Sequence, residues 1–160
     1  MALRRILTQE EETLTMTSRV VENFDRRLHI LLGDMADTLR DAGGIGLAAP
    51  QVGVLRRVAI VDTGEEILEL VNPEIIGVSG EQEGSEGCLS FPGIYGIVAR
   101  PMKVTIRAQD RNGAYFEKTE EGLMARAFCH EVDHLNGKLF VALVTRYLDT
   151  ESVGEDGVGI

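Results

Sequence analysis

The stretch EGLMARAFCHEVDHLNG, residues 121–137, decides how we interpret the fold. Its apolar residues recur every three or four positions and cover a broad face, which predicts a deeply buried helix over residues 121–136. Gly137, just past the last apolar residue, is typical of a helix end. His130 and His134 stand four positions apart, so on a helix their imidazoles can point at one spot.

The segment HEVDH, residues 130–134, has the spacing of a metal site. Two neutral imidazoles one helical turn apart suit a divalent transition metal. Glu131 is too close to His130 to be a comfortable third ligand, but it is well placed to contact a water on the metal. The pattern therefore indicates two ligands and a general base. The alternative is two histidines that stabilise a helix C-terminus. We interpret Asp133 as a group that orients a ligand histidine or pairs with an arginine.

A catalytic metal site needs a third protein ligand and an open position. Cys88 lies in EGSEGCLSFPG, which we interpret as a tight loop or strand edge, and its thiolate is a candidate ligand. The alternative for Cys88 is a small buried hydrophobe. Cys129 projects about 100° away from His130 around the helix, so it cannot easily share the metal. His29 lies within another predicted helix, and we expect it at the surface or boundary.

The rest of the chain surrounds the 121–136 helix with strands and one further helix. Residues 24–42 carry apolar groups on one helical face, and Gly43 and Gly44 end this N-terminal helix. The turn Arg111-Asn112-Gly113 is a strong hairpin signal. Strands are predicted at residues 57–62, 67–73, 103–110 and 114–119. The fold class is therefore α+β, with short, mostly antiparallel strands packed around a central buried helix that carries HExxH.

Composition limits the classes of function. At 160 residues, with 44% hydrophobic and 26% charged residues, the chain fits one globular domain, which we place at residues 1–148. Residues 149–160 are acidic and glycine-rich, and we expect a mobile tail. The net charge of -10 argues against direct nucleic-acid binding. We find no membrane-length apolar run and no signal-peptide core, so we expect a cytoplasmic protein with no membrane contact.

Three segments in order resemble one family, the peptide deformylases. They are GIGLAAPQ (residues 44–51), EGCLS (86–90) and HEVDH (130–134). HExxH alone indicates only a metallohydrolase, whereas the three motifs together are far more specific. The resemblance covers roughly residues 25–140.

The resemblance implies a metal held by Cys88, His130 and His134, with water as fourth ligand and Glu131 as proton carrier. The implied reaction removes the N-formyl group from the initiator methionine of newly synthesised polypeptides, giving formate and a free amino terminus. The Leu89 backbone N–H and the Gln51 amide would stabilise the developing oxyanion. The alternative for Gln51 is a loop-capping amide. The family implies Fe²⁺ as the native ion, with Zn²⁺, Ni²⁺ or Co²⁺ able to substitute.

The resemblance also predicts the residues that hold the formylated peptide. The bare backbone at Gly44 and Gly46 would pair with an extended peptide, although a simple turn is the alternative. The expected substrate-binding residues are Gly44, Ile45, Gly46, Gly87, Arg100, Leu123 and Ala127. The apolar members would line a methionine pocket together with His130, but they are equally good core residues. Arg100 is expected beside the groove, with a solvated surface arginine as the alternative.

Some features depart from the family pattern. The N-terminal region lacks the usual glycine-aspartate-proline turn, and Cys129 replaces a glutamine; we assign Cys129 no catalytic role. Because the chain lacks a basic C-terminal docking helix, we expect at most weak ribosome association. Two other functions compete with deformylation. An HExxH peptidase usually takes histidine or a carboxylate as third ligand, and a non-catalytic metal-binding or peptide-binding module needs neither Glu131 nor Gln51.

Overall fold

The computed structural model describes residues 2–149 and residue 160. Two α-helices lie in this part of the chain, α1 (Arg26–Ala42) and α2 (Gly122–Leu135). The strands are β1 (Gly46–Ala48), β2 (Val58–Asp62), β3 (Ile67–Ser79), β4 (Gln82–Cys88), β5 (Phe91–Arg100), β6 (Lys103–Gln109), β7 (Tyr115–Glu121) and β8 (Arg146–Leu148). Three short 3-10 helices are η1 (Glu12–Thr15), η2 (Ala49–Val52) and η3 (Phe140–Ala142). The predicted α+β class, with mostly antiparallel strands, is confirmed.

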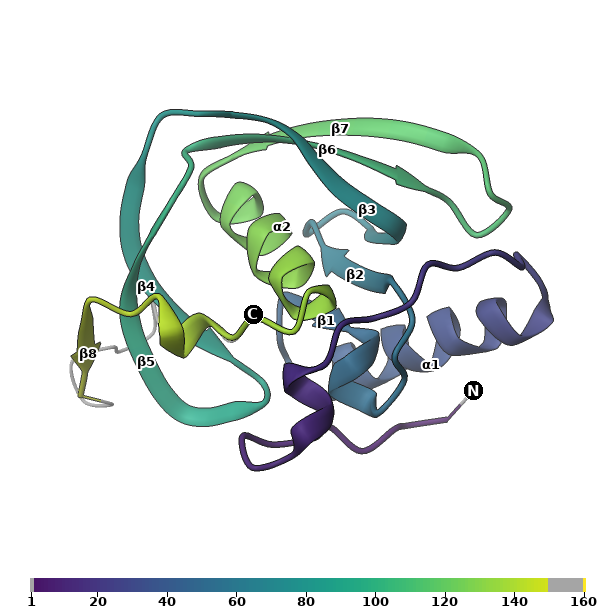
Figure 1. The fold of residues 1–160 in the computed structure, drawn as a ribbon, viewed down its shortest axis with the longest axis horizontal. Helices are drawn as coiled ribbons and strands as arrows, with labels where there is room; N and C mark the ends of the chain where they lie inside the picture. The colour runs from purple at the N-terminus through teal and green to yellow at the C-terminus, as the bar shows by residue number, and fades with distance from the viewer. Residues whose placement is uncertain (1, 150–159) are drawn as a thin grey trace.

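The strands form two sheets. The larger has the order β1-β2-β3-β6-β7, the smaller has the order β4-β5-β8, and neighbouring strands are antiparallel throughout. Figure 1 shows α2 enclosed by the long β3, β6 and β7 ribbons on one side and the β4–β5 pair on another. Strands β1 and β4 are therefore edge strands of different sheets, and α2 is the element between the sheets.

The larger sheet separates two apolar clusters by strand alternation. In β2, Val58 and Ile60 belong to the cluster around α1, whereas Ala59 and Val61 belong to the cluster around α2. Successive side chains of a strand point to opposite faces, so each helix covers one face. Helix α1 buries one stripe, made of Leu28, Leu31, Leu32, Met35 and Leu39. Each such side chain stabilises the fold by roughly 1.5–3 kcal/mol when fully buried.

Both helices end close to the predicted positions, and capping residues define both ends of α1. The Asp25 side chain accepts a hydrogen bond from the Leu28 N–H at the start of α1. Gly43 ends that helix in the left-handed conformation, with φ 71°. Helix α2 is one residue shorter than predicted at each end, and Gly137 beyond it also has a positive φ, 72°.

The strand predicted to end at Asn72-Pro73 continues instead to Ser79. Asn72 has φ 51° and its side chain bonds the Val21 N–H and C=O, which holds a kink inside β3. The register with β6 shifts at this point, so Pro73, which has no N–H to donate, fits the irregularity. Asn72-Pro73 therefore marks an irregularity within β3 and not the end of the strand.

The segment around EGCLS forms a hairpin that we interpreted only as a loop or strand edge. Strand β4 ends at Cys88, β5 begins at Phe91, and Leu89 and Ser90 make the turn. Residues 150–159, which carry most of the predicted mobile tail, lie outside the described residues. Ile160 is buried, with 1% of its surface exposed. The mobility of the tail stays a prediction. In the described part of the chain, no helix is long and apolar enough to cross a membrane.

Candidate metal centre

Three donor atoms from two elements meet at one buried point. The Cys88 Sγ at the end of β4 lies 3.3 Å from the His134 Nε2, which lies 3.1 Å from the His130 Nε2 on the preceding turn of α2. The candidate ligand atoms all lie within 4.8 Å of one another, and the three residues are buried. Nitrogen ligands at about 2.0–2.1 Å from a tetrahedral ion lie roughly 3.3 Å apart, so these spacings fit a shared cation.

The protonation of the donors also fits a cation. The His130 Nδ1 lies 2.6 Å from the Glu86 Oε1, so a proton there leaves the Nε2 free to act as a ligand. Burial lowers the pKa of His134, which keeps its imidazole neutral. Burial raises the pKa of the Cys88 thiol. A bound divalent cation deprotonates a coordinating thiol outright, and it would therefore stabilise the buried thiolate.

Glu131 lies between the two histidines on α2, and its carboxylate is buried without hydrogen-bond donors from the described residues. Its side chain is fully buried, and neither carboxylate oxygen has a hydrogen-bond partner among the described residues. Burial raises the pKa of this carboxyl well above its usual value, and the nearby charge of Glu86 raises it further. Unpartnered buried carboxylates cost stability and are therefore rare in structures unless chemistry needs them.

Gln51 is held beside the cysteine by the 3-10 helix η2. Its Oε1 accepts a hydrogen bond from the Ala48 N–H at 2.9 Å, and its Nε2 donates to the Ser90 Oγ at 3.0 Å. The same Nε2 lies 3.5 Å from the Cys88 Sγ. The amide is fully buried, so its orientation is fixed by these contacts. Its N–H group is aimed at the turn that contains Leu89, although Ala48 also gives it the loop-capping bond considered as an alternative.

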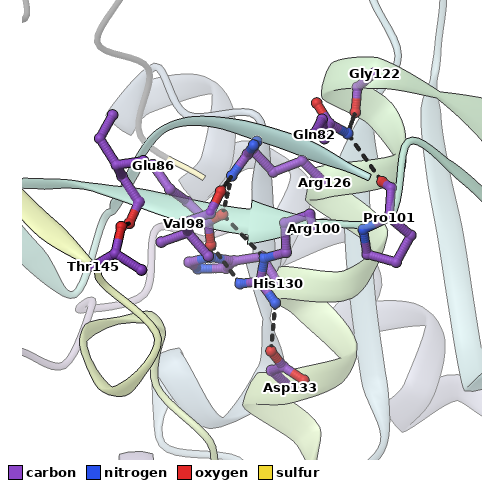
Figure 2. A network of polar contacts seen from close by, with 11 residues as sticks. Gln82, Glu86, Val98, Arg100, Pro101, Gly122, Arg126, His130, Asp133 and Thr145 are labelled. Atoms are coloured by element: carbon purple, nitrogen blue, oxygen red, sulfur yellow. Dashed lines mark hydrogen bonds and ion pairs between the residues drawn. The ribbon is translucent and has the colours of Figure 1, made fainter. Parts of the chain in front are cut away.

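A second buried carboxylate, Glu86, organises the opposite side of His130 (Figure 2). It accepts hydrogen bonds from His130, from Arg100 at 3.1 Å and 2.5 Å, and from Arg126 at 2.8 Å. Burial opposes ionisation, but the hydrogen bonds from His130 and Arg100 outweigh it and hold the pKa of Glu86 far below its usual range. Arg100 also pairs with Asp133 at 2.7 Å, as one interpretation of Asp133 anticipated.

This network excludes one of the positions considered for Arg100. Its side chain is buried, with 6% of the residue exposed, and its guanidinium contacts Glu86 and Asp133, so the alternative of a solvated surface arginine is wrong. The physical reason is that Glu86, buried on β4, needs cationic donors. The place of Arg100 beside a peptide groove stays a prediction. The sequence reasoning missed Glu86 and Arg126. The available signal was that Arg126 precedes His130 by four residues and so shares its helix face.

The remaining predicted substrate residues fall into two groups. Gly44, Ile45 and Leu123 line one cavity of about 300 Å³, which Asp62, Thr63, Gly64 and Met124 complete. Leu123 is 47% exposed, so it is not a core residue. Ala127, by contrast, is fully buried in the cluster around α2. His29 is partly buried and contacts the Arg111 carbonyl through its ring, away from the candidate metal centre.

Two of the three glycines predicted for the groove lie on the edge strands β1 and β4. Gly46 begins β1 and Gly87 precedes Cys88 in β4. The Gly87 carbonyl accepts a hydrogen bond of 3.1 Å from the Ile160 N–H. Ile160 belongs to the same apolar cluster as Ala127 and Val132. The edge of β4 next to Cys88 therefore accepts a main-chain donor from outside the sheet.

Comparisons with known proteins agree with this geometry. The family model for polypeptide deformylase matches residues 3–148. A peptide deformylase of Caldicellulosiruptor bescii is 56% identical over 96% of this chain and 92% of its own length. Peptide deformylase 2 of Clostridium acetobutylicum is 50% identical over 92% of this chain and 99% of its own length.

Solved structures give the same result for the fold. The crystal structure of a peptide deformylase from Legionella pneumophila superimposes with a TM-score of 0.87 at 49% identity, covering 89% of this chain and 86% of that one. The Thermotoga maritima enzyme gives a TM-score of 0.87 at 35% identity, covering 89% and 98%. The chain thus belongs to the polypeptide deformylase family, the hydrolases that remove the N-formyl group from newly synthesised polypeptides.

Proposed function

We propose that this chain carries out deformylation with a divalent cation held by Cys88, His130 and His134, and with Glu131 as the proton carrier. The observation that supports this most strongly is the convergence of the three donor atoms within 4.8 Å, one residue from a buried carboxylate that has no partner among the described residues. The cation would supply Lewis acidity, activating water and polarising the formyl oxygen.

In this proposal Glu131 accepts a proton from the attacking water and then delivers it to the leaving nitrogen. Water adds its oxygen to the formyl carbon, the C–N bond breaks, and formate and a free amine result. A general base of this kind contributes typically about 10²- to 10⁴-fold in rate. Burial raises the pKa of the Glu131 carboxyl, which moves it from its usual acidic value in the direction that general acid–base catalysis at neutral pH requires.

The carbonyl oxygen of the formyl group would develop negative charge, and two donors are assigned to it. They are the Gln51 Nε2 and the Leu89 backbone N–H. Gln51 is oriented before substrate arrives, since Ala48 and Ser90 already hold both ends of its amide. Fixed donors need no reorganisation during the reaction, which is what makes them effective.

The peptide would bind as an extended strand between the edge strands β1 and β4, in place of the Ile160 main chain at Gly87. The contact between the Ile160 N–H and the Gly87 carbonyl supports this, because it shows the β4 edge pairing with extra main chain. Ile45 and Leu123, which line one cavity, are assigned to the methionine side chain together with Ala127. Gly44 and Gly46 would supply the opposite backbone wall.

Fe²⁺ is proposed as the native ion, with Zn²⁺, Ni²⁺ or Co²⁺ as substitutes. A ligand set of one thiolate and two imidazoles suits borderline or soft ions and does not suit Mg²⁺ or Ca²⁺. We place the reaction in the cytoplasm on N-formylmethionyl nascent peptides, with weak ribosome association at most. Actinonin, present in crystal structures of the Synechococcus elongatus and Acinetobacter baumannii relatives, is proposed to compete for the same groove.

One experiment tests the central proposal. The protein is purified without oxygen, and metal content and formate release from a formyl-methionyl tripeptide are measured on one sample. The acetylated tripeptide and an unblocked peptide serve as controls for formyl specificity and for internal cleavage. Cys88→Ala should lose most of the metal and the formate release, whereas Cys129→Ala, the matched cysteine control, should keep both. Full metal content in the Cys88 variant would remove this residue from the ligand set.

A further inference from the structure

We infer that Gly46 is a positioning residue for Glu131: its missing side chain makes the space in which the Glu131 carboxylate sits. A β-carbon added at Gly46 would lie 2.9 Å from the Glu131 Cδ and 3.2 Å from its Cγ, and closer still to its Oε2. Real β-carbons essentially never approach a heavy atom closer than 3.0 Å. Glu131 and any larger residue at position 46 therefore cannot both occupy their present places.

Strand alternation explains why position 46 faces Glu131. Leu47 belongs to the apolar cluster around α1, whereas Ala48 belongs to the cluster around α2. Residues two apart in a strand share a face, so Gly46 points to the α2 side together with Ala48. Pairing of Gly46 with Val61 in β2 fixes this register.

The backbone of Gly46 does not itself require glycine. Gly46 is absent from the glycines with positive φ, so an alanine could adopt its conformation. The requirement comes from the neighbouring carboxylate. Glu131 is fully buried, and its oxygens have no hydrogen bonds to described residues that could hold it elsewhere. A side chain at position 46 would therefore displace the carboxylate, and a displacement of about 1 Å at a reacting group costs on the order of 100-fold in rate.

The alternative explanation of Gly46 is that a bound peptide needs bare backbone there. The two explanations differ in what they predict. If a side chain at position 46 obstructs the peptide, Gly46→Ala raises KM. Its effect on the stability of the free protein is then the same whether or not the Glu131 side chain is present. Displacement of Glu131 lowers kcat, and its stability cost disappears when the glutamate side chain is removed. The kinetic part of this inference rests on the proposed role of Glu131, but the stability part does not.

The experiment is a double-mutant cycle of Gly46→Ala and Glu131→Ala on the metal-loaded protein. Gly46→Ala should lower the unfolding midpoint by about 5 °C in the parent and by much less in the Glu131→Ala background. It should also lower kcat about 100-fold, with KM and metal content little changed. Gly77→Ala is the matched strand control, because its added β-carbon would lie 3.7 Å from Thr105, an ordinary contact.

Two results would overturn the inference. One is an equal loss of midpoint in both backgrounds; the other is a raised KM with kcat retained. If Gly46→Ala alone does not fold, the double variant Gly46→Ala/Glu131→Ala decides. A folded double variant supports the inference, and an unfolded one refutes it. A Glu131→Ala protein that kept full turnover would refute Glu131 as the base. The unfolding midpoints of the double-mutant cycle would still decide whether Gly46 makes space for the Glu131 side chain.

Discussion

Glu86 and Glu131 are both fully buried carboxylates near His130, but their surroundings are opposite. Glu86 receives hydrogen bonds from His130, Arg100 and Arg126, and its pKa is held low. Glu131 receives none from the described residues, and burial raises its pKa. The difference shows that burial alone does not decide what a carboxylate does. Cationic donors stabilise the ionised form of Glu86, whereas Glu131 has no such donor among the described residues, which suits the proton-carrier role that we propose for it.

The largest expected effect is on activity, from Glu131→Gln. This change keeps the shape of the side chain and removes its ability to accept a proton. We expect deformylation to fall by about 1000-fold or more, with metal content unchanged and stability equal or higher, because an unpartnered buried carboxylate is removed. Formate release, metal analysis and thermal unfolding on one preparation measure all three. Turnover within about tenfold of the parent would contradict the proposed role.

The matched change at the other carboxylate, Glu86→Gln, should have its main effect on stability. It leaves Arg126 and part of Arg100 as buried charges without their anionic partner. Breaking a buried ion pair in this way costs about 3–5 kcal/mol, which corresponds to roughly 10 °C in the unfolding midpoint. Metal affinity should fall by about 10- to 100-fold, because His130 loses the group that orients it. A variant as stable as the parent would show that Glu86 is not the anchor we describe.

Asp133→Asn sharpens the comparison at the edge of the same network. Its side chain is 22% exposed and, among residues 2–149, forms an ion pair with Arg100 alone, which Glu86 also holds. We therefore expect a smaller loss, about 1 kcal/mol, seen as a few degrees in the midpoint. Activity per bound metal should be retained. A loss as large as that of Glu86→Gln would mean that the network acts as one unit, with no single central carboxylate.

The sequence was sufficient for the local parts of this comparison. The spacing of His130 and His134 predicted a shared point on a helix, because residues four apart lie on the same helix face. The family resemblance predicted that Cys88 joins them, and its Sγ lies close to both imidazoles. The Glu86 network could not be predicted, since it joins residues 44 positions apart, Glu86 and His130. Glu86 lies in a segment that the pattern assigned only to a tight loop or strand edge. Glycines and a serine in β4 carry little apolar alternation, so the strand gave no periodic signal.

Asp34 is a third carboxylate of low exposure, and it provides the mildest test. It accepts hydrogen bonds from the Ala2 N–H and the Arg4 Nε, both at 3.0 Å, and so fastens the N-terminal segment to α1. Burial opposes ionisation, but these donors outweigh it and lower the pKa of Asp34. A lowered pKa means that the stabilising contribution is present above the unfolded-state value, near pH 4, and is lost as pH falls through the folded-state value.

Asp34→Asn should therefore lower the unfolding midpoint by a few degrees at pH 7, for a loss of about 1 kcal/mol. The difference between parent and variant should stay constant down to about pH 5 and shrink below about pH 4. Thermal unfolding of both proteins across this range measures it, and any loss of metal in acid affects both alike because Asp34 is remote from the candidate metal centre in sequence and contacts. A difference that grew with acidity would reverse the assigned sign. It would place Asp34 with Glu131, as a carboxylate that the folded protein prefers to protonate, and not with Glu86.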